Sequence, residues 1–175
     1  LKKDSNNLHF FDRSLLILFK YWFNPSFLVL ESIDWSTPAN ILEKIIAYEA
    51  VHEINSWDDL RARLAPEDRK CFAFFHPLMP NEPLIFVEVA LTNDMPDSIS
   101  EIIKIDRPIT QEQDINTAVF YSISNCQEGL SGISFGNFLI KNVAHKLKQE
   151  NDGLDKFVTL SPMPGFSKWL DKKSI

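Results

Sequence analysis

The chain has 175 residues with ordinary apolar and charged fractions, which suits one globular domain, or one domain with part of another. Its net charge of −6 comes without a basic stripe, which argues against nucleic acid as a partner. A membrane span is not expected, because the best apolar run, residues 15–23, is too short and contains Lys20.

The N-terminal residues 1–23 begin polar and become amphipathic. Apolar residues at helical spacing predict a helix that starts at Asp12 or Ser14 and ends before Asn24-Pro25. The aromatic side chains Phe19, Trp22 and Phe23 are interpreted as core. Because the chain starts without Met, we also interpret it as a piece of a longer protein.

Residues 27–33 are apolar and predict a first strand, which two helices follow. The first helix is expected to begin with Thr37 as N-cap and Pro38 at its first position. The second begins at Ser56, three residues before Asp59, and closes at Ala65-Pro66. The buried faces are expected at Ile41, Leu42, Ile45 and Ile46, and then at Leu60 and Leu64.

Residues 71–75 and 84–91 are strand-like runs separated by a proline-bearing turn, which predicts a hairpin. A turn at 93–96, a short helix at 98–104 and a polar loop at 106–116 follow. The two cysteines, Cys71 and Cys126, fit neither a metal spacing nor a disulfide framework, so both are interpreted as packing residues in a reducing compartment. A redox role for Cys126 is the less favoured alternative.

The stretch 117–166 reads strand (118–123), glycine loop, helix (133–150), strand (157–160). It predicts two parallel strands joined by a right-handed crossover. Helical spacing places a buried stripe at Phe135, Leu139, Val143 and Leu147. The whole order is typical of an α/β protein with a mixed sheet.

A glycine loop that opens a helix is suited to a phosphorylated ligand. The first N–H groups of a helix have no internal partner and lie at the positive end of its dipole. Glycines beside them permit close approach of a pyrophosphate. By itself the pattern is weak, since a plain turn is the commoner reason for two glycines before a helix.

The amino-acid sequence of this stretch also resembles a known family. The segments FYSISNCQEGLSG, FGNFLIKNV and LSPMPGFSKWL resemble the malonyl-CoA decarboxylase family, and the resemblance extends more loosely upstream to about Phe27. One departure from the general acetyltransferase pattern is that Cys126 stands three residues before Gly129 and Ser131 two residues after it, so the loop matches the decarboxylases better.

The resemblance implies a GCN5-related acetyltransferase-like fold, an α/β mixed sheet with flanking helices. Residues 1–25 would be the end of a helical domain, and residues 26–175 a catalytic domain that is incomplete at its C-terminus. Coenzyme A would be held mainly by backbone N–H groups of one loop: Gly129, Leu130, Ser131, Gly132, Ile133, Ser134, Phe135 and Gly136. Tyr121 and Ser122 are expected to flank the pantetheine arm.

Ser161 is the expected catalytic residue. It stands at the end of a strand and before a proline, where ligands of open α/β sheets gather. By resemblance it corresponds to the serine that hydrogen-bonds the malonyl head group; on its position alone, a turn-capping serine is the simpler explanation. It lacks the G-x-S-x-G elbow of hydrolases.

The family's proton-donating histidine is expected beyond Ile175. None of His9, His52, His76 and His145 matches it; His52 is placed at a helix end, where a cation is favourable. The chain alone is therefore expected to be inactive.

The resemblance implies decarboxylation of malonyl-CoA to acetyl-CoA and CO2, with no metal or organic cofactor because the substrate itself carries coenzyme A. An acyl-CoA-dependent acyltransferase and a non-catalytic acyl-CoA-binding module are the alternatives. Expected partners are malonyl-CoA and, in the full-length protein, further copies of the chain, but neither nucleic acid nor membrane. The expected compartment is the cytoplasm in a bacterium, or mitochondria or peroxisomes in a eukaryote.

Overall fold

The computed structural model describes residues 2–173, with side chains from residue 8 onward. A five-stranded sheet in the order β1-β2-β3-β4-β5 forms its centre. The first three pairings are antiparallel and the last, between β4 and β5, is parallel. The strands are β1 Val29–Ile33, β2 Arg69–His76, β3 Met79–Thr92, β4 Thr117–Asn125 and β5 Lys156–Thr159. The predicted mixed sheet is confirmed.

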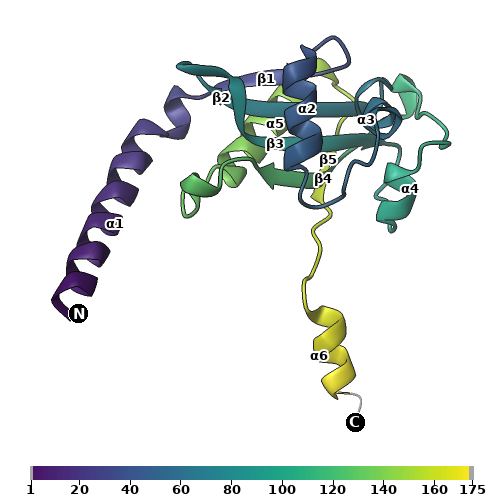
Figure 1. The fold of residues 1–175 in the computed structure, drawn as a ribbon. Coiled ribbons are helices and arrows are strands. Elements are labelled where there is room, and N and C mark those ends of the chain that lie inside the picture. Colours follow the sequence, from purple (N-terminus) through teal and green to yellow (C-terminus); the bar gives the residue numbers. More distant parts are fainter. Residues whose placement is uncertain (1, 174–175) are drawn as a thin grey trace.

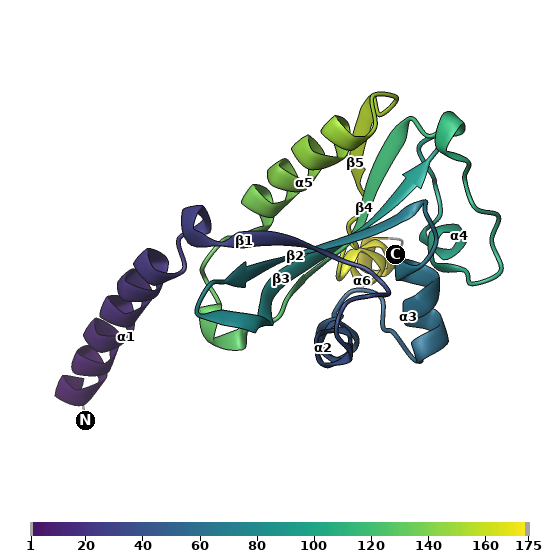
Figure 2. The same cartoon turned by 90° about the horizontal axis from the view of Figure 1, so that it is seen from above.

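Helices cover both faces of this sheet (Figures 1 and 2). Successive side chains of a strand point to opposite faces, and in β2 both sets are apolar. Phe72 and Phe74 pack with the face of α5 (Gly136–Glu150), whereas Cys71, Ala73 and Phe75 pack with α2 (Ala39–Tyr48) and α3 (Trp57–Leu64). This explains why β2 reads as a continuous apolar run.

The predicted helix faces are buried as expected. Ile41, Leu42 and Ile45 of α2 and Leu60 and Leu64 of α3 are buried, and Ile46 is half-buried. The stripe Phe135, Leu139, Val143 and Leu147 is also buried under α5.

The two predicted helix starts have different outcomes. Ser56 caps α3 by accepting a hydrogen bond from the Asp59 N–H at 3.1 Å, as predicted. The prediction for Thr37 is wrong: α2 begins at Ala39, and the Thr37 hydroxyl accepts from the Asp34 N–H at 3.0 Å instead of capping the helix. The Asp34 N–H therefore competes with the helix terminus for the Thr37 hydroxyl.

The N-terminal helix α1 (Lys2–Trp22) differs from its prediction in two ways. It begins well before Asp12, and it stands away from the sheet (Figure 1). Trp22 is 56% exposed, so its interpretation as core is wrong, while Phe19 and Phe23 are half-buried. A short 3-10 turn, η1 (Pro25–Phe27), then leads into β1, which starts two residues later than predicted.

The region between β3 and β4 is held by one buried carboxylate. Asp68 accepts from both terminal nitrogens of Arg107, at 2.7 and 3.0 Å, and from the Thr110 N–H at 3.0 Å. These bonds tie the predicted polar loop to the start of β2. The loop contains the short turn η2 (Glu112–Asp114), and the predicted short helix before it is α4 (Ile99–Ile103).

The parallel pair β4–β5 positions the candidate site. The pairing covers Thr117–Phe120 and Lys156–Thr159, so within the described chain residues 121–125 of β4 continue with no partner in β5. Both strands run in the same direction, and the loops that follow them emerge at the same edge of the sheet. This edge is where ligands bind in open α/β sheets.

One helix was not predicted. α6 (Phe166–Lys173) follows β5 and stands away from the sheet (Figure 1). Its apolar side chains Phe166, Trp169 and Leu170 are exposed. Among the helices of residues 2–173, none combines the length and the hydropathy that crossing a bilayer would take.

Candidate functional site

The glycine loop lies between β4 and α5, and its start differs from the prediction. The turn η3 (Glu128–Leu130) comes first, with Leu130 N–H donating to the Gln127 carbonyl at 3.0 Å. Gly132 then takes φ +87°, in the left-handed region, and α5 begins only at Gly136 rather than at Ile133. A left-handed residue cannot belong to a right-handed helix, so Gly132 stays outside α5.

The N-terminus of α5 offers unpaired donors. The first hydrogen bond of the helix runs from the Leu139 N–H to the Phe135 carbonyl at 2.9 Å. Within the described chain the N–H groups of Gly136, Asn137 and Phe138 have no hydrogen-bond partner. No side chain among the described residues caps this end, so an anion could take these donors.

A hollow of about 260 Å³ adjoins this loop. It is lined by Leu84, Asn125, Gln127, Glu128, Leu130, Ser131, Gly132, Ile133 and Phe135. Five of the eight predicted coenzyme A residues are among them: Leu130, Ser131, Gly132, Ile133 and Phe135. On another side the loop meets α1, because a Cβ on Gly132 would lie 3.6 Å from Leu16 Cδ1.

Ser161 lies beside a different hollow, of about 250 Å³, lined by His52, Asp97, Ile99, Leu160, Ser161 and Pro162. Ser161 itself is exposed, and its hydroxyl has no hydrogen-bond partner among residues 8–173. The two hollows share no lining residue. The structure thus places the loop and Ser161 at the same sheet edge but not in one cavity.

A histidine that sequence reasoning did not select shares the hollow with Ser161. His52 follows α2 in a loop, and its ring centroid lies 6.4 Å from that of Tyr121. The sequence signal was only that His52 stands near a helix end, and nothing in the spacing connects it with Ser161. The other histidines lie elsewhere: His9 and His145 are exposed, and His76 Nδ1 accepts from the Leu78 N–H at 3.2 Å.

The expectation for Tyr121 and Ser122 needs correction. Both are buried, at 1% and 2% exposure. The Ser122 hydroxyl lies 2.7 and 2.8 Å from the two carboxylate oxygens of Glu49 and donates to them. The Ser122 side chain therefore belongs to the interior between β4 and the end of α2, whereas the Tyr121 ring packs in a cluster with Ile102 of α4.

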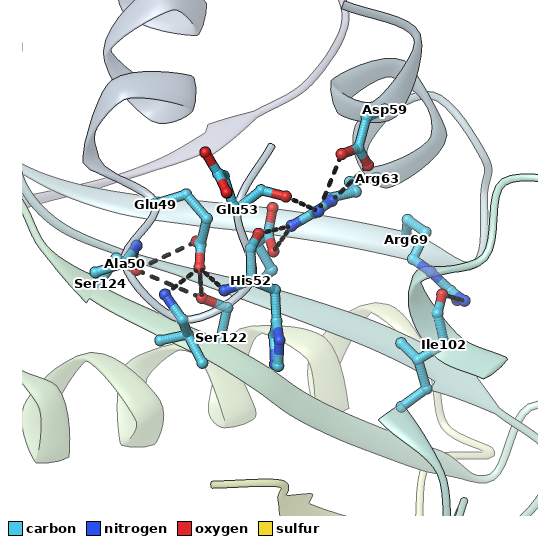
Figure 3. Close-up of polar contacts among 12 residues, drawn as sticks. Glu49, Ala50, His52, Glu53, Asp59, Arg63, Arg69, Ile102, Ser122 and Ser124 are labelled. Atoms are coloured by element: carbon cyan, nitrogen blue, oxygen red, sulfur yellow. Dashed lines mark hydrogen bonds and ion pairs between the residues drawn. The ribbon is translucent and has the colours of Figure 1, made fainter. Parts of the chain in front are cut away.

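A buried polar network lies behind His52 (Figure 3). The carboxylate of Glu49 accepts from the N–H groups of Val51 and His52, each at 2.8 Å. Arg63 donates to the carbonyls of His52 and Glu53 at 2.7 and 3.0 Å.

Arg63 also pairs with two carboxylates, Asp59 at 3.1 Å and Glu88 at 3.3 Å. Burial raises the pKa of the Glu88 carboxyl to about 8, and the neighbouring Glu49 adds to the effect, while Arg63 opposes it. Among the described residues, Glu88 Oε1 has no hydrogen-bond partner. The protonated form of Glu88 is therefore favoured in the folded protein more than in solution.

Neither cysteine is a candidate nucleophile. Cys71 is fully buried and Cys126 is 7% exposed. Burial raises the pKa of both thiols, which disfavours the reactive thiolate. The interpretation of both as packing residues agrees with this burial.

Comparison with solved structures defines the fold class first. The protein resembles a ribosomal-protein-alanine N-acetyltransferase from Brucella melitensis biovar Abortus 2308, with a TM-score of 0.52 over 83% of this chain and 89% of that one. The sequences are only 12% identical, so this likeness shows an acetyltransferase-like fold and no more.

The family follows from closer relatives. Residues 26–175 match the family described as "Malonyl-CoA decarboxylase C-terminal domain", and the chain belongs to that family. A malonyl-CoA decarboxylase structure from Agrobacterium vitis is 58% identical, with a TM-score of 0.89, and the match covers 92% of this chain and 40% of that one. The mitochondrial malonyl-CoA decarboxylase of Anser anser anser is 45% identical over 85% of this chain. The match spans 30% of that goose protein's length.

Proposed function

We propose that the protein of which this chain is part decarboxylates malonyl-CoA to acetyl-CoA and CO2. The observation that carries the proposal is membership of the decarboxylase family over residues 26–175, with 58% identity to the Agrobacterium vitis enzyme. The geometry is compatible, since a loop with free N–H donors and a serine with a free hydroxyl follow two parallel strands.

The reaction makes two demands on the protein. Cleavage of the bond between the methylene carbon and the carboxylate leaves its electron pair on the thioester as an enolate. The enolate oxygen needs fixed donors, and a positioned acid must deliver a proton to the carbon. The thioester is the electron sink, so we propose that no metal or organic cofactor takes part.

Coenzyme A binding is assigned to the loop Gly129–Gly136. The support is the unpaired N–H groups at the start of α5 and the adjoining hollow of about 260 Å³. The same eight residues named from the sequence remain the proposed binding set.

Ser161 is proposed to hydrogen-bond the malonyl group. Its hydroxyl is exposed and free of partners in the described chain, in contrast to the buried Ser122 and Ser124, which are bound to Glu49. A hydroxyl without an internal partner is available to a ligand at no cost in internal hydrogen bonds.

The full-length protein tests this function when it is incubated with malonyl-CoA and no acyl acceptor. We expect release of CO2 and formation of acetyl-CoA, and Ser161→Ala should lower kcat by about 10²–10³, as loss of one oxyanion donor does in other enzymes. Binding of coenzyme A should persist in this variant.

Ser167→Ala is a matched control, because Ser167 is exposed on α6 outside the proposed site. A full-length protein that forms no acetyl-CoA would refute the decarboxylase. Turnover only after an amine is added would indicate an acyltransferase on the same fold, and ligand binding with no turnover would indicate a binding module.

The remaining partners and the compartment follow the proposed function. We propose malonyl-CoA as the substrate, a homo-oligomer as the full-length assembly, and no nucleic-acid or membrane partner. The compartment would be the cytoplasm in a bacterial source, and mitochondria or peroxisomes in a eukaryotic one; the Anser anser anser relative is named as mitochondrial.

A further inference from the structure

The hollow beside Ser161 contains few side chains that can donate a hydrogen bond. Ile99, Leu160 and Pro162 are apolar, and Asp97 when ionised only accepts. The Ser161 hydroxyl and the His52 imidazole are the two side-chain donors in this lining. Among the side chains of this lining, these two are the ones that can donate to an anionic acyl group.

The peptide unit of His52 is fixed on both sides by buried charged groups (Figure 3). Its N–H donates to Glu49 Oε1 at 2.8 Å, and its carbonyl accepts from Arg63 Nη1 at 2.7 Å. Glu49 is 9% exposed and Arg63 is 3% exposed. Hydrogen bonds to ionised groups are shorter and stronger than neutral ones, so the His52 backbone has little freedom.

The two clamping side chains are themselves tied to the central strands. Glu49 accepts from Ser122 and Ser124 of β4, and Arg63 pairs with Glu88 of β3. Buried ionic networks of this kind are weak contributors to stability compared with apolar packing, because desolvation offsets the attraction. Their clear geometric consequence here is to hold His52 in one position relative to the sheet.

The imidazole lies between the interior and the hollow. Its ring is tilted by 34° against the ring of Tyr121, which is fully buried, and the side chain is half-buried. Tyr121 thus supports one side of the imidazole while His52 lines the hollow with Ser161.

We infer that His52 is a second substrate-contacting residue, whose imidazole donates a hydrogen bond to the terminal carboxylate of the acyl group. The inference rests on the proposed function. Asp97 is exposed in the same lining and, when ionised, repels an anion, which makes the two side-chain donors of the lining more important. His52 would therefore help the site select a carboxylated acyl-CoA over one that has lost its carboxylate.

The experiment compares the full-length wild type with His52→Ala and His52→Gln. The KM and kcat for malonyl-CoA and the inhibition constant of acetyl-CoA, which lacks the carboxylate, are measured. We expect His52→Ala to lower kcat/KM for malonyl-CoA about tenfold or more, the effect of one lost hydrogen bond to a charged group. The inhibition constant of acetyl-CoA should change by less than about twofold.

Controls separate contact from structure. His52→Gln retains a side-chain donor and should restore part of the loss, while His145→Ala, exposed on α5, should resemble wild type. Thermal unfolding is measured for every variant, and a wild-type Tm for His52→Gln would keep the test valid if His52→Ala is destabilised.

Two results would overturn the inference while leaving the proposed function intact: an unchanged kcat/KM in His52→Ala, or equal weakening of malonyl-CoA and acetyl-CoA. If the wild type releases no CO2, the proposed function fails. Titration calorimetry with the same two ligands then still decides whether His52 reads the carboxylate, since no turnover disturbs the measurement.

Discussion

The Glu88 carboxyl is a titratable side chain in an environment very different from water. It lies fully buried on β3 and pairs with Arg63 at 3.3 Å, and the charges of Glu49 and Asp59 act on it as well. Burial, with the neighbouring Glu49, raises its pKa to about 8 despite the contact with Arg63. At neutral pH it therefore carries a proton more readily than an exposed glutamate would.

This shift predicts a pH-dependent stability. The folded-state pKa of Glu88 is raised above the unfolded value of about 4.3. The contribution of Glu88 to the free energy of unfolding is therefore complete below the unfolded pKa and is lost as the pH rises through about 8. We expect Glu88→Gln, which cannot ionise but still accepts from Arg63, to gain in Tm relative to wild type as the pH rises from about 6 to about 9. Thermal unfolding across this range checks it, and a constant difference in Tm would contradict the raised pKa.

At the scale of elements, the connection from β4 to α5 depends on one backbone conformation. Gly132 has φ +87°, whereas Gly129 has an ordinary φ, and no atom lies within 4 Å of the position that a Cβ on Gly129 would take. The sequence identified both glycines but could not say which of them is required, because φ is set only when the turn η3 and the start of α5 are both in place.

We expect Gly132→Ala to destabilise the protein by about 1 kcal/mol, because an L-residue is disfavoured at positive φ. It should also raise the Kd for coenzyme A, since Gly132 lines the hollow at the loop. Gly129→Ala is the matched control and should leave the unfolding free energy nearly unchanged. Chemical denaturation and ligand titration measure both effects; equal stability of the two variants would show that the left-handed turn is not maintained in solution.

At the scale of the whole molecule, two helices extend from the sheet at different places. α1 exposes Phe10, Tyr21 and Trp22, and α6 exposes Trp169 and Leu170 (Figure 1). The chain spans 30% of the length of the goose relative that it matches. The lining of the Ser161 hollow contains two side-chain hydrogen-bond donors, the His52 imidazole and the Ser161 hydroxyl.

Because the Ser161 hollow has few side-chain donors, we predict that residues 1–175 alone do not decarboxylate malonyl-CoA. Proton delivery to carbon needs an acid placed in the site, and the sequence-based expectation puts that residue after Ile175. The isolated chain and the full-length protein are compared for CO2 release at equal concentration. Turnover by the isolated chain at a rate near that of the full protein would disprove the need for further residues.

The amino-acid sequence by itself determined the order of the five strands along the chain, the mixed sheet and the buried faces of α2, α3 and α5. Those features depend on local patterns and caps, as in the continuous apolar run of β2 and the cap at Ser56. The resemblance over 117–166 indicated the family from the residues alone. The prediction that Thr37 caps a helix is wrong because the Thr37 hydroxyl accepts a hydrogen bond from the Asp34 N–H instead. The prediction that Trp22 is in the core is wrong because a helical stripe of apolar residues does not reveal whether another element covers it.

Only the tertiary structure decided that His52 shares a hollow with Ser161 and that Glu49, Arg63, Ser122 and Glu88 form one buried network. These groups come from α2, α3, β3, β4 and the loops between them, so no spacing along the chain connects them. They meet because the sheet brings β3 and β4 side by side and packs α2 and α3 onto one face, which converts large separations in sequence into contacts of hydrogen-bond length.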